Sequence, residues 1–488
     1  MNAQHTHFTV QLRTLIDRVY GDGKSKDTLL AHANNFFKQY AEYHTKVNEL
    51  NENLAALPTA SNSAKSKKKG NNPQQAQVES QLNQVEENFK QQNAQRRLHL
   101  QSIAEELISL CEGESFEESN RKSAQCLGAL QLLSPSEGSK VALINEQHKP
   151  LYKAVLALRL LDHICANNEI VDPYLTEFTQ DIDADKFKQF NQIAPNQYRR
   201  YVENVKIPLV MAAMLQDIGN YHPQAREIML GADGKADPFR TLPMEERKKL
   251  LQINYRETLS LVTQGIGQLN YIGNSKEERD QFNIEQQQQI QFIRQLLKSS
   301  VKPGDGIGNI LKVPQIYASI VLSTKDSYNY KLLPKVYQAL NQNAERGACS
   351  QAVVDALYQI TGMFPQGYGI TYIPNESDGH PSDFYEYAIV TQLYPDNPEE
   401  PLCRVATRQL TFVSYGQDIE ISKDRNLYFI DTARRLARLS KTRLNEILEL
   451  LASNYHERKD LDLLPRCWQA STYFSIKKNQ KLWNKRTN

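Results

Sequence analysis

The nine residues from Ile207 to Leu215 carry no polar side chain, and this run constrains the fold more than any other segment. A helix that is apolar on every side cannot face water and has to be enclosed by other elements. The run is far shorter than the roughly 20 apolar residues that span a bilayer. The sequence therefore predicts that residues 205–219 form the buried central helix of a body built from several helices.

The surrounding sequence supplies further helices. From about residue 145 to 365, apolar residues recur at helical spacing in successive segments, which predicts a helical domain over 145–365. Pro243 and Ser275 mark two helix starts, the first with acidic residues in its opening turn and the second with a capping box. The buried face of the helix after Pro243 is expected to consist of four residues: Leu251, Tyr255, Leu259 and Val262.

Residues 366–430 change character. Short β-branched and aromatic runs at 368–373, 385–393, 404–414 and 427–430 are separated by Pro, Asn, Asp and Gly, so a small antiparallel sheet is predicted. Residues 431–488 should return to helices and end in a basic tail. Its single aromatic residue, Trp483, is expected to lie at a solvated end.

Residues 1–115 form a predicted helical module with two heptad runs. The first extends from Leu29 to Leu54 and the second from Val78 to Leu110, and the polar, basic stretch between them predicts a flexible linker over 57–75. Two arrangements satisfy this pattern. One is an antiparallel hairpin within the chain, and the other is a coiled coil between two chains, which would make a homodimer through residues 28–110.

Charge and targeting signals exclude several partners. With 488 residues and a net charge of +2, the chain has no global attraction for nucleic acid or membrane surfaces. The basic run at 65–69 has no interleaved aromatic residue, so it is interpreted as solvated linker. No segment resembles a signal peptide. We expect a cytoplasmic protein without a membrane or nucleic-acid partner.

The end of the central helix carries a degenerate motif. Gln216, Asp217, Ile218, Gly219 and Asn220 resemble His-Asp-Ile-Gly-Lys of the HD-GYP family, bacterial phosphodiesterases of the HD superfamily that hydrolyse cyclic di-GMP. The resemblance covers roughly half of the chain, from about 145 to 400. It implies a mainly α fold: an HD-domain-like helical bundle with an N-terminal coiled coil or helical hairpin and a small C-terminal antiparallel β region.

Later segments resemble the same family. Asp305, Gly306 and Gly308 match its Asp-Gly-Thr-Gly-Tyr-Pro loop, and Asp326 matches an aspartate that closes the metal site. The histidine expected on the family's opening helix has no counterpart in register, although His148 and His163 flank that helix. From the residues alone, a plain turn is the favoured interpretation of the glycine loop, and a structural carboxylate that of Asp217.

The metal ligands that the resemblance implies are mostly replaced. Asp217 and Asp326 remain, whereas four other positions have lost histidine: Gln216, Asn254, Ser300 and Val301. Two carboxylates could hold a divalent ion weakly, but they could not rebuild a histidine-rich site that generates hydroxide. No cofactor is therefore expected, and if one binds it should be Mn²⁺, Fe²⁺ or Mg²⁺.

These observations predict a catalytically degenerate protein that acts in bacterial second-messenger signalling by binding cyclic di-GMP or a protein partner. The predicted ligand-binding residues are those of the former active site: Asp217, Asn220, Asn254, Lys302, Asp305, Gly306 and Gly308. One alternative is an active cyclic di-GMP phosphodiesterase with an altered metal site. Another is an oligomeric scaffold that binds no ligand.

Overall fold

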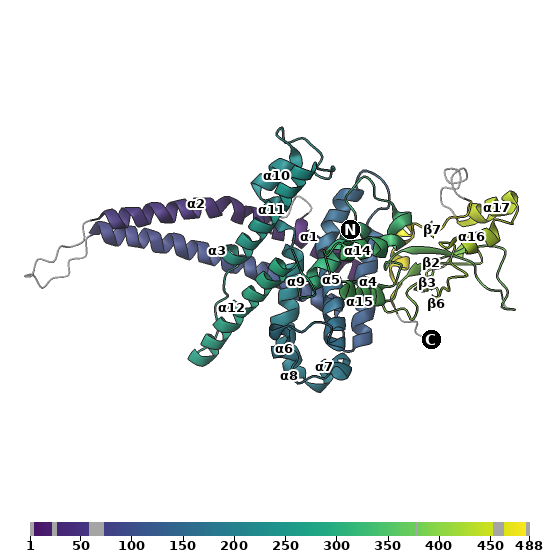
Figure 1. The fold of residues 1–488 in the computed structure, drawn as a ribbon, viewed down its shortest axis with the longest axis horizontal. Helices are drawn as coiled ribbons and strands as arrows, with labels where there is room; N and C mark the ends of the chain where they lie inside the picture. Colours follow the sequence, from purple (N-terminus) through teal and green to yellow (C-terminus); the bar gives the residue numbers. More distant parts are fainter. Residues whose placement is uncertain (1–3, 22–26, 58–72, 377, 452–462, 485–488) are drawn as a thin grey trace, which may run out of the picture.

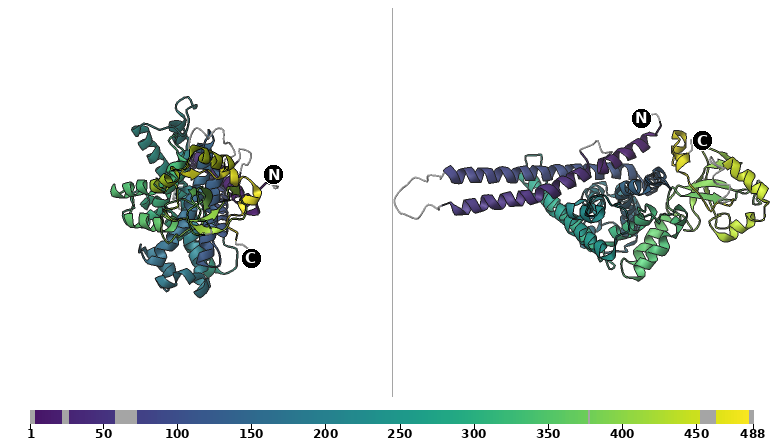
Figure 2. Two further views of the ribbon diagram at one scale, coloured as in Figure 1. Left: turned by 90° about the vertical axis from the view of Figure 1, so that its right-hand side faces the viewer. Right: turned by 90° about the horizontal axis from the view of Figure 1, so that it is seen from above.

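The computed structural model describes residues 4–21, 27–57, 73–376, 378–451 and 463–484. They form an elongated molecule in which a long helical hairpin projects from one end of a helical body and a small sheet closes the other end (Figures 1 and 2). The mainly helical prediction with a C-terminal antiparallel sheet is confirmed. Within the described residues, no helix is long and apolar enough to cross a membrane.

The N-terminal module is a hairpin within the chain. After α1 (His7–Tyr20), α2 (Leu29–Ala56) packs along α3 (Pro73–Cys111), and the Tyr43 and Phe89 rings stack 3.9 Å apart between them (Figure 1). Most of the predicted linker, residues 58–72, lies outside the described residues, and its end is helical because α3 begins at Pro73. The hairpin alternative is thus the observed one, while dimerisation through residues 28–110 stays a prediction.

The predicted central helix is α9 (Ile207–Leu215), and each of its residues is buried. It packs against α5 (Val141–Asn167), α12 (Lys276–Ser299) and the end of α3, while α13 (Asn309–Val321) lies on the other flank of α5. The interval 116–140, to which the sequence assigned no element, forms α4 (Phe116–Leu133) between α3 and α5. The core therefore extends without interruption from the hairpin base into the helical body.

Shorter helices complete the body, and the two predicted helix starts are confirmed. Pro243 precedes α11 (Met244–Ser260), and the Ser275 hydroxyl accepts from the Glu278 amide at the start of α12. The remaining helices of this region are α6 (Pro173–Thr179), α7 (Phe190–Ile193), α8 (Pro195–Tyr201), α10 (Pro223–Leu230), α14 (Val336–Glu345), α15 (Gln351–Thr361) and the short turns η1 (Ala184–Gln189), η2 (Val202–Lys206), η3 (Ile218–Tyr221), η4 (Leu261–Gly265) and η5 (Tyr330–Lys335).

The expected buried face of α11 is wrong in its first half. Leu251 and Tyr255 are 58% and 39% exposed, whereas the polar residues Asn254 and Thr258 are buried. The reason is that α11 packs its polar side against η3, where the Thr258 hydroxyl accepts from the Gly219 amide at 3.1 Å. The helix thus presents apolar side chains to solvent and polar ones to η3.

The sheet has five strands in the order β6-β3-β2-β1-β7, paired antiparallel throughout. Its strands are β1 (Gly369–Tyr372), β2 (Glu386–Val390), β3 (Leu402–Val405), β6 (Asp418–Glu420) and β7 (Cys467–Trp468), and β4 (Thr407–Arg408) pairs separately with β5 (Thr411–Phe412). The strand predicted at 427–430 is wrong, because the Asn426 side chain accepts from the Tyr428 amide and turns the chain there. The edge position is taken instead by β7, from the C-terminal region.

The C-terminal region is helical as predicted, with α16 (Ile430–Leu436), α17 (Lys441–Leu451), α19 (Ser471–Phe474) and the short turn η6 (Lys477–Gln480). The expectation that Trp483 lies at a solvated end is wrong. Its ring is 4% exposed, packs against Gly128 of α4 and donates from Nε1 to the Thr391 carbonyl at 2.8 Å. Burial of a tryptophan ring is strongly favourable in free energy. Gly128 has no side chain, so the neighbouring helix leaves space for the ring.

Candidate functional site

Asp217, the central residue of the degenerate motif, is paired with a lysine. Its Oδ2 lies 2.5 Å from Nζ of Lys153, and its Oδ1 accepts from Nε2 of Gln315 at 3.0 Å. Lys153 comes from α5 and Gln315 from α13, so three helices of the body meet at this carboxylate. Both carboxylate oxygens are thereby engaged by side chains of the protein itself.

The charge of Asp217 is balanced within this pair. Burial works against ionisation of Asp217, but the ammonium group of Lys153 outweighs burial and holds the pKa of Asp217 below its usual value. The Lys153 side chain is 3% exposed, so its ammonium group has little water to compensate for a lost partner. An ammonium group of the protein thus neutralises the Asp217 carboxylate.

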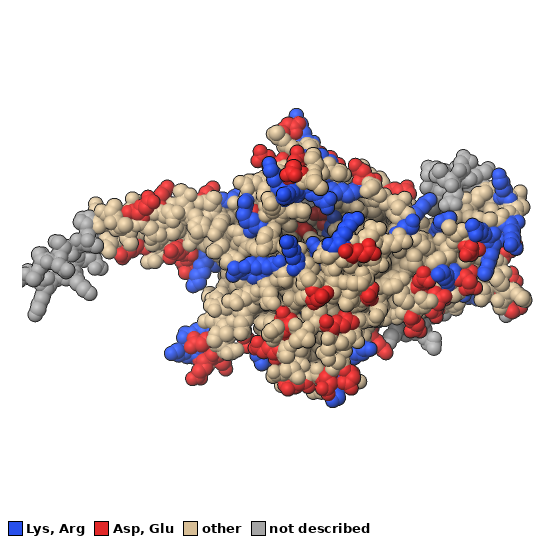
Figure 3. All heavy atoms as spheres, in the orientation of Figure 1, with Lys and Arg blue, Asp and Glu red and all other residues tan. Residues whose placement is uncertain are grey.

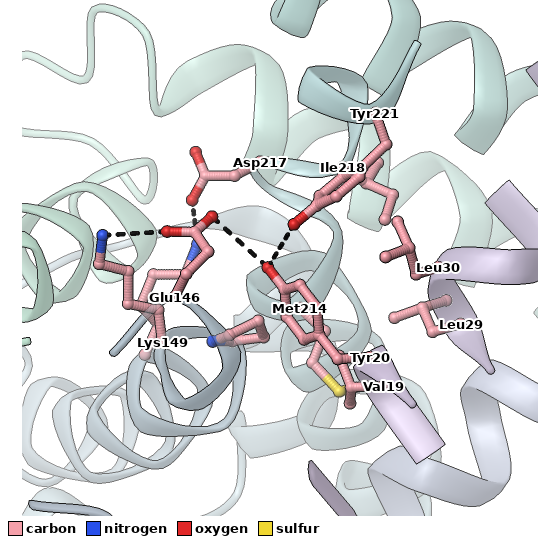
Figure 4. Close-up of a pocket in the computed structure, with 12 residues that line it drawn as sticks. Val19, Tyr20, Leu29, Leu30, Glu146, Lys149, Met214, Asp217, Ile218 and Tyr221 are labelled. Carbon is pink, nitrogen blue, oxygen red and sulfur yellow. Dashed lines mark hydrogen bonds and ion pairs between the residues drawn. The ribbon is translucent and has the colours of Figure 1, made fainter. Parts of the chain in front are cut away.

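A small pocket lies in front of this pair (Figure 4). Glu146 accepts from Lys149 at 3.2 Å and from the Tyr20 hydroxyl at 3.4 Å, and the Tyr221 hydroxyl donates to Tyr20 at 2.8 Å. The pocket offers a free volume of about 20 Å³, which is room for about one water molecule. It cannot enclose a nucleotide, so any ligand of this region has to lie outside it.

The histidines considered for the opening helix face other partners. Nδ1 of His148 lies 2.8 Å from the Ser134 hydroxyl of the α4 end, and His163 packs on the ring of Tyr394. The residue of α5 that does reach Asp217 is Lys153. Sequence reasoning missed it, although a lysine within the otherwise apolar run 150–158 is a signal that a buried partner exists.

Asp326 lies apart from these contacts. It is exposed, and no hydrogen bond or ion pair among the described residues joins it to Asp217 or to a histidine. In the part of the chain that the structure describes, the one group of three potential metal ligands lies at the hairpin base instead. Metal binding by Asp217 and Asp326 stays a prediction without support from these contacts.

Asn220 and Asn254 lie on the two segments that pack together beside Asp217. Asn254 is buried in α11 and donates to the Gln216 carbonyl at 3.3 Å. Gly219 approaches the Asn254 backbone so closely that an added Cβ would lie 2.2 Å from its carbonyl oxygen. In this position Asn254 joins η3 to α11, and the half-buried Asn220 continues the same turn.

The glycine loop is closed by its own side chains. Asn309 donates from Nδ2 to the carbonyls of Gly304 and Gly306, at 2.8 and 2.9 Å, and its Oδ1 accepts from the Ser350 amide. The Ser350 hydroxyl in turn donates to Asp305 at 2.8 Å. These bonds support a plain turn.

Two further residues of the predicted set belong to this loop. Gly308 has no room for a side chain because the Ser299 backbone lies against it, and Lys302 is exposed at the start of the loop. The four loop residues of the predicted site, Lys302, Asp305, Gly306 and Gly308, therefore lie where α12, α13 and α15 meet. The Lys302 and Asp305 side chains are exposed, and Asp305 already accepts from Ser350.

An open groove lies along α11, and none of the predicted ligand-binding residues lines it. We call it the α11 groove; its volume is about 750 Å³ and its lining residues are Leu242, Met244, Glu245, Arg247, Lys248, Leu251, Gln252, Tyr255 and Val301. It contains the exposed apolar side chains of α11 together with Val301, which directly precedes Lys302. Pockets of this size are typical of small-molecule sites.

The surface around the α11 groove is cationic. Figure 3 shows Lys and Arg side chains gathered around the hollow below α10 and α11. Burial and the nearby charges of Lys149 and Arg247 lower the pKa of Lys325, whose Nζ donates to the carbonyls of Phe239 and Arg240. No carboxylate among the described residues forms an ion pair with Arg247 or Lys325. This excess of positive charge suits an anionic ligand.

A buried ionic network lies on the opposite side of α5. Arg159 and Lys206 each pair with both Glu112 and Asp162, at 2.9 Å for Arg159 and Asp162 and 3.0 Å for Lys206 and Glu112. Two cations and two carboxylates balance in charge, which explains how four charged groups remain buried between α3, α5 and η2. The network was not predicted, although Arg159 and Asp162 within an apolar helix are a sequence signal for it.

The comparisons with known proteins do not identify a relative. No family model matches the chain, and neither curated proteins nor solved structures provide a match. The resemblance to the HD-GYP family therefore rests on the quoted motifs.

Proposed function

We propose that this protein is a catalytically degenerate HD-GYP-like protein that binds cyclic di-GMP and transmits that binding to a protein partner of second-messenger signalling. The observation that supports the catalytically degenerate part of the proposal is the Lys153–Asp217 pair. The aspartate of the motif has an ammonium group 2.5 Å away and no histidine among its hydrogen-bond or ion-pair partners in the described residues.

Hydrolysis is disfavoured by the same pair. Metal-dependent phosphodiesterases need a metal-bound water whose pKa is brought near neutrality by convergent ligands. A divalent ion at Asp217 would have to displace Lys153 and leave its ammonium group buried without a counter-ion, which costs several kcal/mol. The alternative of an active phosphodiesterase with an altered metal site therefore has less support than binding.

The α11 groove supports a dinucleotide as the ligand. Arg247 can pair with a phosphate through two parallel N–H donors, and Lys248 adds a second positive charge beside it. Tyr255, Leu251 and Met244 offer exposed faces on which a guanine base can stack or pack. The groove thus combines phosphate-binding cations and base-binding surfaces along one helix.

The scaffold alternative is favoured by a different feature, the hairpin. Figure 2 shows α2 and α3 projecting well beyond the helical body, and the outer parts of both helices contact only each other. The scaffold alternative is that this projection joins chains into an oligomer through residues 28–110 without any ligand. A full chain that is monomeric in solution by light scattering would count against it.

Calorimetric titration of the full chain with cyclic di-GMP tests the proposal. We expect binding that weakens at least tenfold in Arg247→Ala, since a charge-assisted contact contributes about 1.5–3 kcal/mol. Lys249→Ala is the matched control, because Lys249 is exposed on the same helix outside the groove lining. Absence of heat at high micromolar ligand would overturn the binding function.

A hydrolysis assay separates the two HD-GYP-like alternatives. The full chain is incubated with cyclic di-GMP and Mn²⁺ or Fe²⁺, and the linear product is quantified. We expect no product above the metal-only background. Multiple turnovers together with stoichiometric metal in the purified protein would replace the degenerate function by the active one.

A further inference from the structure

The hairpin base contains a cluster of potential metal ligands far from the α11 groove in sequence. Asp27 lies just before α2, His32 in the first turns of α2, and His99 on α3. The Oδ1 atom of Asp27 is 2.8 Å from Nε2 of His32 and 3.6 Å from Nδ1 of His99. One ligand atom from each residue lies within 4.8 Å of the others, and the two imidazole rings are 4.8 Å apart.

The tautomer of His99 is suited to metal binding. Its Nε2 lies 3.3 Å from the backbone carbonyl of Arg18, which can only accept, so Nε2 carries the proton. Nδ1 is then left with its lone pair toward Asp27. Histidine ligands typically have this arrangement, in which the second ring nitrogen donates to a carbonyl or carboxylate that fixes the ring.

The nearest cation, Arg18, is neutralised by Glu106 at 2.6 Å and also donates to Ser102. Its charge therefore opposes a bound cation only in part.

We propose that Asp27, His32 and His99 bind a divalent transition-metal ion such as Zn²⁺. Two imidazoles and one carboxylate suit Zn²⁺, Co²⁺ or Ni²⁺ and not Mg²⁺ or Ca²⁺, which take oxygen ligands. Tetrahedral ligands at 2.0–2.1 Å from zinc lie roughly 3.3 Å from one another, so the two Asp27 separations bracket the required value. The ligand atoms lie within 4.8 Å of one another, so the imidazole nitrogens need to approach by at most about 1.5 Å.

The ion would join the entry of α2 to α3. The Asp27 side chain is 79% exposed, which leaves an entry path and a coordination position for water. Because the ligands come from both helices of the hairpin, binding would hold the hairpin base closed. The site is independent of the proposed nucleotide binding, since it shares no residue with the α11 groove.

The test uses the full chain after removal of any histidine tag and treatment with a chelator. Titration with ZnCl₂ should show one equivalent bound per chain and a rise in melting temperature, and Co²⁺ should give the visible absorption of tetrahedral coordination. Asp27→Asn and His32→Ala should each weaken Zn²⁺ binding by at least roughly tenfold. His44→Ala, an exposed histidine of the same helix, should leave it unchanged.

If His99→Ala fails to fold, Asp27→Asn still tests the proposal. Asp27 is exposed, and the asparagine side chain has the same size as aspartate. Circular dichroism before titration confirms that each variant is folded. Zn²⁺ binding that persists in Asp27→Asn and His32→Ala, or no binding by the unmodified chain at 1:1 metal in the micromolar range, would overturn the proposal.

Discussion

The ammonium group of Lys153 lies 2.5 Å from the carboxylate of Asp217, and it comes from the helix on which the resemblance places a metal-binding histidine. The two residues are 64 positions apart in the sequence, and the contact joins α5 to the end of α9. In this pair a cation of the protein itself already neutralises the carboxylate of the motif.

Replacing Asp217 should therefore cost stability. In Asp217→Asn the ammonium group of Lys153 remains buried without a counter-ion, and breaking such a pair costs about 3–5 kcal/mol. We expect the lower end of that range, because the Asp217 side chain is 36% exposed and water screens part of the loss. Urea denaturation measures the change in the free energy of unfolding.

Asp326→Asn is the matched control for this experiment. Asp326 is exposed and has no ion pair among the described residues, so its free energy of unfolding should change by less than about 0.5 kcal/mol. Equal effects of the two substitutions, or stabilisation of the unmodified chain by Mn²⁺ that both of them abolish, would favour a shared metal site instead.

Acid sensitivity should originate in Glu112. Burial opposes its ionisation, but Arg159 and Lys206 outweigh burial and lower its pKa to about 2. A carboxyl group with a lower pKa in the folded state adds stability above its unfolded pKa of roughly 4.3, here on the order of 3 kcal/mol, and loses it as the pH falls toward 2. Burial raises the pKa of Asp162, which offsets part of this loss.

The corresponding measurement is melting temperature against pH in Glu112→Gln. The variant should be less stable at neutral pH, because Arg159 and Lys206 lose a partner, and its melting temperature should fall less steeply between pH 4.5 and 2. Glu117→Gln, at an exposed neighbouring position, should keep the slope of the unmodified chain. An unchanged slope in Glu112→Gln would assign the acid sensitivity to other carboxylates.

Trp483 should be essential for stability in spite of its position near the end of the chain. Trp483→Ala removes a ring that is 4% exposed and leaves a cavity beside Gly128, so we expect a loss of about 3–5 kcal/mol. Ile476→Ala, at a side chain that is 49% exposed, should change the free energy of unfolding by less than about 0.5 kcal/mol. If the C-terminal tail were solvated, Trp483→Ala and Ile476→Ala would both change the free energy of unfolding by small, similar amounts.

Because apolar side chains of α11 face solvent, a substitution there should change ligand binding without changing stability. Leu251→Ser should change the free energy of unfolding by less than about 0.5 kcal/mol, because this side chain already faces solvent, yet it should weaken cyclic di-GMP binding. Leu261→Ala, one helical segment later and 3% exposed, should cost about 2–5 kcal/mol. A large loss of unfolding free energy in Leu251→Ser would contradict the exposed position of this side chain.

Local patterns predicted the elements well where contiguous residues decide them. The apolar run 207–215, the Ser275 cap and the first two predicted strands, at 368–373 and 385–393, each lie where expected. Errors occurred where a partner distant in sequence decides the environment. Leu251 is exposed because polar residues of α11 face η3, and Trp483 is buried because Gly128 leaves space for it.

In the candidate site, too, some features are visible in the sequence and others depend on helix packing. The loss of histidine at 216 and 254 is visible in the sequence, and so is the lysine at 153 within an apolar helix. That Lys153 meets Asp217 depends on the rotation of α5 against α9, which many side chains along both helices determine together. The cluster of Asp27, His32 and His99 depends likewise on the register of α2 against α3.

The sequence by itself determined that the chain is mainly helical, that residues 207–215 are buried, and that the histidine-rich chemistry of the resembled family is absent from its aligned positions. Periodicity and composition act locally, so they can be read without a partner. Only the tertiary structure decided which charged groups meet, because the pairing of Lys153 with Asp217 and of Glu112 with Arg159 arises from helix packing between distant segments.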